Sequence, residues 1–310
     1  MRIVISGATS FVGINLIRAL IKDGENEIIA LIRENSPNRS LLNEFGDRIR
    51  IFCVDLNNIN TLSNYIDYLD AFYLVAWRGT RGQDRNNEEM QKENYIDTIE
   101  TIKVAIKLNA KTIIGIGSQA EYGYVETKID ESIVPRPTSK YGLYKLKVYQ
   151  EGKKICEQKS VSFKWGRIFS AYGIGDYSKT LVMYCINNML KGLPVYVSSC
   201  TQMWNYTNII DIAHIFARMC GNDIPSGLYN VCGDDTRFLK EFVEEIKKIT
   251  KSSSEILYDS QDSTSEKVTL NPVNSKIKSF LKDMEYIPFD DGILSIINSI
   301  NLAYEYRLSL

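Results

Sequence analysis

The stretch Arg2–Gly13, RIVISGATSFVG, decides the fold. A β-branched apolar run leads into a glycine-rich turn, and the turn opens a helix-length segment at Val12–Asp23. Glycine allows backbone to approach a pyrophosphate closely, and the N-terminus of the next helix offers free N–H groups and a partial positive charge. The order of strand, glycine turn and helix therefore predicts a dinucleotide-binding unit at the start of the chain.

The turn supplies the first predicted contacts to a dinucleotide. Ser10 stands where the usual pattern has its middle glycine, and a small residue fits there. We expect the turn and the first helical residues to face the phosphates, namely Gly7, Thr9, Ser10, Phe11, Val12 and Gly13.

Short apolar runs alternate with helix-length segments through the first 165 residues. Several runs are nearly continuous, as in strands covered on both faces. The predicted strands are Arg2–Ser6, Glu27–Ile32, Ile49–Val54, Ala71–Val75, Thr112–Ile116 and Val161–Trp165, and the main helices between them are Val12–Asp23, Asn86–Asn109 and Ser139–Gln158. This alternation predicts an α/β fold with a doubly wound parallel sheet of the Rossmann type.

The alternation loosens after Gly166, which indicates a second, smaller α/β unit. We expect residues 1–175 to form the dinucleotide-binding domain, with 204–234 returning to it, and residues 176–310 to form a discontinuous substrate domain. Helices are predicted there at Ser178–Leu190, Ile209–Cys220, Arg237–Thr250, Asn274–Lys282 and Asp291–Ala303.

Composition excludes several classes of function. The net charge of −1 gives no bulk attraction to nucleic acid or to an anionic membrane, and no apolar run is long enough to span a bilayer. The six cysteines form no C-x-x-C pair and fit a reducing compartment, so we expect a cytoplasmic protein. His214 is the only histidine, which excludes a multi-histidine metal site. We expect no metal.

The end of the second strand indicates which dinucleotide is bound. A carboxylate there favours NAD, but this chain has Arg33, 20 residues after Gly13, followed by Ser36 and Arg39. Because an arginine can bind a 2′-phosphate and stack on adenine, we interpret the pattern as a preference for NADP(H), with NAD(H) possible. At the end of the third strand, Asp55 and the adjacent Leu56 are candidates for contacts to the adenine.

The catalytic candidates are Ser118, Tyr141 and Lys145. Tyr141 and Lys145 form Y-x-x-x-K, so they share one face of a helix, and Ser118 ends a glycine-containing strand 23 residues upstream of Tyr141. A neighbouring ammonium favours the phenolate, which lowers the phenol pKa from about 10 and makes tyrosine a usable acid or base. The serine hydroxyl can hydrogen-bond both the reacting oxygen and the tyrosine.

These residues resemble the extended short-chain dehydrogenase/reductase superfamily, in its NAD(P)-dependent epimerase/dehydratase group that modifies nucleotide sugars. The resemblance extends to LVAW at 74–77, to ENYIDT around Asn94, to GRIFSAYG at 166–173 and to QMWNYTNIID at 202–211. Two positions depart from the group's pattern: Ser170 replaces an asparagine, and Trp204 replaces an arginine that meets the phosphates of the sugar nucleotide.

The resemblance implies further site residues. On the cofactor side they are Val75, Ala76, Trp77, Asn94 and Ile168, and Lys145 also meets the nicotinamide ribose. On the substrate side they are Thr80, Gln119, Glu121, Tyr122, Ser170, Tyr177 and Trp204.

The resemblance also narrows the chemistry. The 4,6-dehydratases of the group carry an Asp-Glu pair where this chain has Gln119 and Ala120, which argues against dehydration. Arg33 argues against an epimerase that recycles tightly bound NAD. The stretches GSQAEYG at 117–123 and AWRGT at 76–80 are most similar to the 4-ketoreductases, which reduce dTDP- or CDP-linked 4-keto-6-deoxyhexoses for surface polysaccharides.

Two alternatives stay open beside this expectation. One is a nucleotide-sugar 4-epimerase with tightly bound NAD, and the other is a non-catalytic NADP-binding interaction protein. The resemblance further implies a homodimer through the helices at Asn86–Asn109 and Ser139–Gln158.

Overall fold

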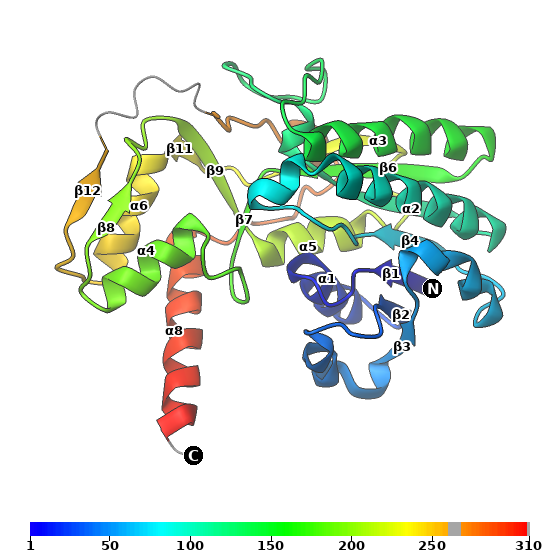
Figure 1. Cartoon of the computed structure of the whole chain (residues 1–310), viewed down its shortest axis with the longest axis horizontal. Coiled ribbons are helices and arrows are strands. Elements are labelled where there is room, and N and C mark those ends of the chain that lie inside the picture. The colour runs from blue at the N-terminus through cyan, green and yellow to red at the C-terminus, as the bar shows by residue number, and fades with distance from the viewer. Residues whose placement is uncertain (260–267, 309–310) are drawn as a thin grey trace.

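The computed structural model describes residues 1–259 and 268–308, with side chains described up to residue 302. Figure 1 shows two lobes, a larger one built on a broad sheet and a smaller one that contains the C-terminal helix.

Seven parallel strands form the large sheet, in the order β10-β6-β5-β4-β1-β2-β3. Their bounds are Arg2–Ser6 (β1), Glu27–Ile32 (β2), Ile49–Cys53 (β3), Ala71–Leu74 (β4), Thr112–Ser118 (β5), Ser162–Ile168 (β6) and Gly227–Val231 (β10). The strand order reverses between β1 and β4, and sheets of this type bind ligands in the crevice beyond the carboxyl ends of the strands at such a point.

Helices cover both faces of this sheet. On one face lie α1 (Phe11–Lys22) and α5 (Ile209–Arg218), and on the other lie α2 (Glu88–Lys107) and α3 (Lys140–Gln158). Alternate residues of a strand point to opposite faces, so Ile3 and Ile5 join the core under α1 while Val4 joins the core under α2. Two apolar cores therefore explain why the strands are nearly continuous apolar runs. Short 3₁₀ helices lie between these elements, at Arg39–Arg48 (η1), Leu56–Asn64 (η2), Gly82–Asn86 (η3) and Gln119–Glu121 (η4).

The small lobe has its own core. Strands β7 (Ser170–Tyr172), β9 (Met203–Asn208) and β11 (Thr236–Phe238) form one sheet, and β8 (Val195–Val197) pairs with β12 (Ile256–Tyr258). Helices α4 (Leu181–Leu190), α6 (Leu239–Ile249) and α8 (Phe289–Leu308) contribute Ile186, Phe242 and Ile293 to that core. The short α7 (Ser275–Lys278) lies against β10.

The predicted fold class is confirmed, and the details differ mainly near the C-terminus. Segment 204–234 gives the large sheet its seventh strand, β10, and packs α5 against α1, whereas β9 pairs within the small lobe. Helix α7 ends at Lys278 instead of Lys282, and Ile277 and Leu281 both lie in the core. Helix α8 begins at Phe289, earlier than predicted.

Across residues 1–259 and 268–308, we find no helix that is both long enough and apolar enough to cross a bilayer.

Candidate active site

The glycine turn after β1 is shaped by close backbone contacts. Gly7 has φ +66°, and a Cβ at this residue would lie 2.7 Å from the backbone nitrogen of Ala76. A Cβ at Gly13 would lie 2.4 Å from the carbonyl oxygen of Gly7. Ser10 caps α1, since its Oγ accepts a hydrogen bond from the N–H of Gly13 at 3.0 Å. The cap gives Ser10 a local role at the position where the usual pattern has a glycine.

This turn fits a pyrophosphate. The N–H groups of Phe11 and Val12 lie in the first turn of α1, ahead of the first helical hydrogen bond at Ile14, and the helix dipole adds positive charge there. Thr9 extends the cradle toward the loop after β2, because its Oγ1 lies 2.9 Å from the Oγ of Ser36. The backbone and hydroxyl groups needed to hold a dinucleotide are thus assembled at one end of the sheet.

The residues predicted to bind the adenosine half lie around the ends of β2 and β3. Arg33 and Arg39 are exposed beyond β2, and Nη1 of Arg39 lies 3.5 Å from the Sγ of Cys53. Asp55 is exposed after β3, whereas Leu56 packs partly into the core. Two basic side chains are therefore exposed just beyond β2.

Tyr141 and Ser118 come together at the carboxyl end of β5. Gly142 lets the first turn of α3 press against η4, since a Cβ there would lie 2.1 Å from the carbonyl oxygen of Ala120. The Tyr141 side chain is buried, and burial raises the pKa of its phenol, while a hydrogen bond with Ser118 and the charge of Arg85 act to lower it. The hydroxyl groups of Ser118 and Tyr141 therefore lie next to each other at this end of β5.

Sequence analysis did not predict that Arg85 lies over the Tyr141 ring. The guanidinium carbon of Arg85 lies 4.7 Å from the Tyr141 ring centroid, and Nη1 of Arg85 donates to the carbonyl oxygen of Thr80 at 3.2 Å. The signal that could have found it is the basic loop WRGTRGQDR at 77–85, directly after β4.

Lys145 is buried behind the tyrosine. Its Nζ donates to the carbonyl oxygen of Ile116 at 2.7 Å and lies 4.0 Å from the ring centroid of Trp77. Burial lowers the pKa of Lys145 to about 7, with Glu121 acting in the opposite direction. The sequence predicts that Lys145 lowers the pKa of the Tyr141 phenol. In the structure, Ser118 and Arg85 are the groups that act to lower this pKa.

Two side-chain amides on α2 form hydrogen bonds with the loop after β4. Nδ2 of Asn94 donates to the carbonyl oxygen of Arg78, while Oδ1 of Asn94 accepts from the N–H of Arg78. Gln91 accepts from Nε1 of Trp77 at 2.7 Å and donates to the carbonyl oxygen of Gly79 at 2.9 Å. Asn94, expected to contact the cofactor, is buried and shapes this loop instead, together with Gln91.

The start of the same loop is tied to β1. The N–H groups of Val75 and Ala76 approach the Oγ of Ser6 at 3.1 and 3.4 Å, which brings this backbone beside Gly7.

Glu121 and Tyr122 do not line a substrate pocket, which corrects our expectation. Both are fully buried. The Glu121 carboxylate pairs with Arg167 at 2.8 Å, and the Tyr122 hydroxyl donates to Oδ1 of Asn230 at 2.6 Å. Their polar groups are occupied by partners inside the protein, so they are not available to a ligand.

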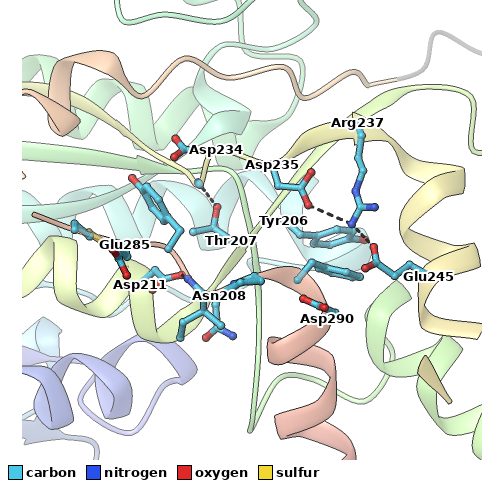
Figure 2. A pocket seen from close by; sticks show the side chains of 16 residues that line it. Tyr206, Thr207, Asn208, Asp211, Asp234, Asp235, Arg237, Glu245, Glu285 and Asp290 are labelled. Atoms are coloured by element: carbon cyan, nitrogen blue, oxygen red, sulfur yellow. Dashed lines mark hydrogen bonds and ion pairs between the residues drawn. The ribbon is translucent and has the colours of Figure 1, made fainter. Parts of the chain in front are cut away.

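A cavity of about 640 Å³ lies in a different part of the molecule. It is bordered by β9, α5, α6 and the segment before α8 (Figure 2). Its acidic side chains are Asp211, Asp234, Asp235, Glu245, Glu285 and Asp290, and Arg237 is the basic residue among those lining it. Such a surface repels phosphate groups, so we do not place a nucleotide sugar there.

The comparisons identify the family. The model of the NAD dependent epimerase/dehydratase family matches residues 3–232. The chain belongs to this family. It is 22% identical over 324 residues to a protein named uncharacterized UDP-glucose epimerase YtcB of Bacillus subtilis, covering 98% of this chain and 99% of that one. It is 27% identical to CDP-abequose synthase of Salmonella muenchen over 83% of each chain.

A solved member of the family has the same fold. The UDP-glucuronic acid 4-epimerase of Bacillus cereus, in complex with UDP-glucuronic acid and NAD, superposes with a TM-score of 0.83. It is 20% identical, and the match covers 98% of this chain and 100% of the epimerase.

Two departures from the family pattern lie next to each other. Nε1 of Trp204 donates to the Oγ of Ser170 at 3.1 Å, across the neighbouring strands β9 and β7. The expected arginine and asparagine are thus replaced by a tryptophan and a serine that bind one another. This pair leaves the phosphates of a family substrate without a cation at position 204.

The other predicted substrate residues follow the ends of β4, β5 and β7. Tyr177 is exposed, and the guanidinium carbon of Arg81 lies 4.6 Å from its ring centroid. Thr80 is exposed and Gln119 is half-buried; Ile168, predicted on the cofactor side, is also half-buried. Nη2 of Arg81 also lies 3.4 Å from the Asp176 carboxylate, so this arginine joins the loop after β4 to the loop after β7.

Proposed function

We propose that the protein is an NADPH-dependent reductase of a dTDP- or CDP-linked 4-keto-6-deoxyhexose that serves surface polysaccharide synthesis. The observation that carries the proposal is the proximity of Ser118 to the buried Tyr141 at the carboxyl end of β5, in the sheet whose first strand leads into the glycine turn. The basic residues beyond β2 support NADPH, and Gln119 in place of an aspartate argues against water loss.

The mechanism follows from this chain's own groups. The bound dinucleotide supplies the hydride. Ser118 and Tyr141 hold the C4 carbonyl oxygen of the sugar by hydrogen bonds, and Tyr141 donates a proton to that oxygen as it gains charge. Arg85 stabilises the phenolate that remains, because its guanidinium lies over the ring. Lys145 holds the carbonyl of Ile116, near the end of β5 that carries Ser118, by a hydrogen bond from its Nζ at 2.7 Å.

A 4-epimerase is the second candidate. It is favoured by the similarity to the B. subtilis protein named as a UDP-glucose epimerase, which extends over nearly the whole chain. An epimerase retains its cofactor and converts substrate without net oxidation, so consumption of NADPH separates the two candidates.

The test measures NADPH and NADH oxidation with a panel of dTDP- and CDP-linked 4-keto-6-deoxy sugars, and epimerisation of UDP-glucose with no cofactor added. A reductase consumes NADPH in proportion to product and prefers it to NADH. Tyr141→Phe should lower kcat by about 10²- to 10⁴-fold. Tyr144→Phe is the matched control, because Tyr144 is a buried tyrosine of the same helix whose hydroxyl bonds Glu88.

Three results would overturn the proposal. Epimerisation of UDP-glucose without NADPH consumption on any 4-keto sugar assigns the epimerase function. Turnover that is unchanged in Tyr141→Phe removes the catalytic role of this tyrosine, and NADPH binding without turnover indicates a non-catalytic protein.

The proposal includes a homodimer formed through α2 and α3. These helices lie side by side, and Ile96 on α2 is 47% exposed, which offers apolar surface. Sedimentation velocity measures the assembly state directly.

A further inference from the structure

A carboxylate lies directly beneath the catalytic serine. Oε1 of Glu121 accepts a hydrogen bond from the backbone N–H of Ser118 at 2.8 Å. The Ser118 Oγ in turn accepts from the N–H of Ala120 at 3.2 Å, so η4 is closed by a reciprocal capping box. The glutamate of a capping box at the protein surface is exposed to solvent, but Glu121 is 0% exposed.

Glu121 is anchored to the neighbouring strand β6. Its carboxylate accepts from Nε1 of Trp165 at 3.0 and 3.2 Å and from Nε of Arg167 at 2.8 Å. One carboxylate therefore ties Ser118 to two large side chains whose own positions are fixed by the core. Because only an ionised carboxylate has enough acceptor sites for all three donors, glutamine cannot satisfy the same set.

Two glycines of β5 make this arrangement possible. A Cβ at Gly115 would lie 2.0 Å from the Trp165 ring, and a Cβ at Gly117 would lie 2.2 Å from its Nε1 and 2.7 Å from Oε1 of Glu121. The glycines therefore let the indole lie flat against the strand that ends in Ser118. The G-x-G-S sequence of β5 is explained by this contact.

The charge of Glu121 is balanced inside the protein. Arg167 is 0% exposed and pairs with Glu121, and its guanidinium carbon lies 4.1 Å from the ring centroid of Tyr122. Among the described residues, Nη1 and Nη2 of Arg167 have no hydrogen-bond partner. The ion pair with Glu121 is thus the main compensation for a buried cation, and a buried pair of this kind contributes little net stability.

We propose that Glu121 is a positioning residue that sets the orientation of Ser118 toward Tyr141, with Trp165 and Arg167 as its supports. The inference rests on the proposed function only in that Ser118 and Tyr141 do the chemistry, and it holds for reduction and epimerisation alike. Removing the acceptor frees the backbone of Ser118 to rotate, which moves its Oγ away from the substrate oxygen without changing how either substrate is bound elsewhere.

The first test is Glu121→Gln, compared with wild type in steady-state kinetics. We expect kcat to fall by about 10²-fold, as misplacement of a catalytic group by about 1 Å does. The KM for the sugar and the Kd for the dinucleotide should change little. Asp211→Asn is the matched control, because Asp211 is also a buried carboxylate that accepts a backbone N–H, from Ile287 at 3.0 Å, and it lies outside the site.

A second variant separates positioning from stability. Glu121→Leu combined with Arg167→Met removes both buried charges together, so that neither is left without its partner, and its free energy of unfolding is measured beside its kinetics. The acceptor for Ser118 is still lost, so kcat should stay reduced in the folded protein. Wild-type kcat in this folded variant would overturn the proposal.

A double-mutant cycle with Ser118→Ala tests whether Glu121 acts through Ser118. Once Ser118→Ala is present, adding the Glu121→Leu/Arg167→Met pair should cause no further loss of kcat. Losses that multiply would assign Glu121 an effect independent of Ser118 and refute the positioning role.

One readout does not depend on turnover. Hydrogen exchange of the Ser118 amide should be faster in the Glu121→Leu/Arg167→Met protein than in wild type, and unchanged in Asp211→Asn. Faster exchange in a protein with no activity on any sugar nucleotide means that the proposed function has failed and the contact is real. Unchanged exchange refutes the inference itself.

Discussion

The burial of the Lys145 amine lowers the free energy of unfolding at neutral pH. Burial lowers its pKa from 10.5 to about 7. At about 1.4 kcal/mol per pKa unit, burying this group destabilises the fold by about 4 kcal/mol at pH 7 relative to a pH above 10.5. The sign follows from proton counts: between pH 7 and 10.5 the unfolded chain binds more protons than the folded chain, so stability rises with pH across that window.

Replacing Lys145 with methionine should therefore stabilise the protein at pH 7. Methionine loses the hydrogen bond to the Ile116 carbonyl, which subtracts about 1 kcal/mol. The net gain is about 3 kcal/mol at pH 7, or about 5 °C in Tm for a chain of this length. The gain should disappear near pH 10, where the wild-type lysine is neutral in the folded state, and catalytic turnover should be lost throughout.

The assay is urea unfolding of the cofactor-free protein at pH 7 and pH 10, followed by circular dichroism. Lys153→Met is the matched control, because Lys153 lies on the same helix with its side chain 52% exposed and should show no such pH dependence. A Lys145→Met protein whose stability relative to wild type is the same at both pH values would refute the reasoning. It would mean that the lysine is charged in the fold at no cost.

Two further substitutions test the packing and the acidic cavity. Gly117→Ala should destabilise the fold by several kcal/mol, because the added Cβ would lie 2.2 Å from Nε1 of Trp165. Gly221→Ala is the control: its Cβ would have no neighbour within 3.5 Å, so this variant should unfold at about the wild-type temperature. Asp211→Asn should stabilise the protein at pH 7.5 by up to about 3 kcal/mol, because burial raises the pKa of Asp211 to about 6. Wild-type stability falls as pH rises from about 4 to 6 through this group, so the advantage of the variant should fade at pH 4. Unfolding curves of Asp211→Asn and wild type at pH 7.5 and pH 4 test this prediction. A stability advantage of the variant that persists at pH 4 contradicts a raised pKa for Asp211.

Local sequence was sufficient for the frame of the site. Strands and the glycine turn follow from short-range patterns, because backbone conformation at Gly7 and the apolar run before it depend on neighbours in the chain. The spacing of Tyr141 and Lys145 and the position of Ser118 at a strand end predict a cluster; the structure places Ser118 beside Tyr141 and bonds Lys145 to the carbonyl of Ile116.

The partners of the polar side chains were not predictable in this way. Glu121 looks like a loop residue in the sequence, yet a tryptophan and an arginine from β6, more than 40 positions away, bury it beneath the serine. Asn94 matches an active-site pattern, but α2 places its amide under the loop after β4. Arg85 reaches the Tyr141 ring because η3 lies against α3.

The sequence by itself determined the order of elements and gave the candidates for the dinucleotide cradle and for the acid or base, since these depend on adjacent or helically spaced residues. Tertiary structure alone decided which charges are buried, which cation faces the phenol and which residues merely hold the catalytic ones. The physical reason is that the cost of burying a charge depends on the partners that packing brings to it, and those partners come from strands and loops far away along the chain.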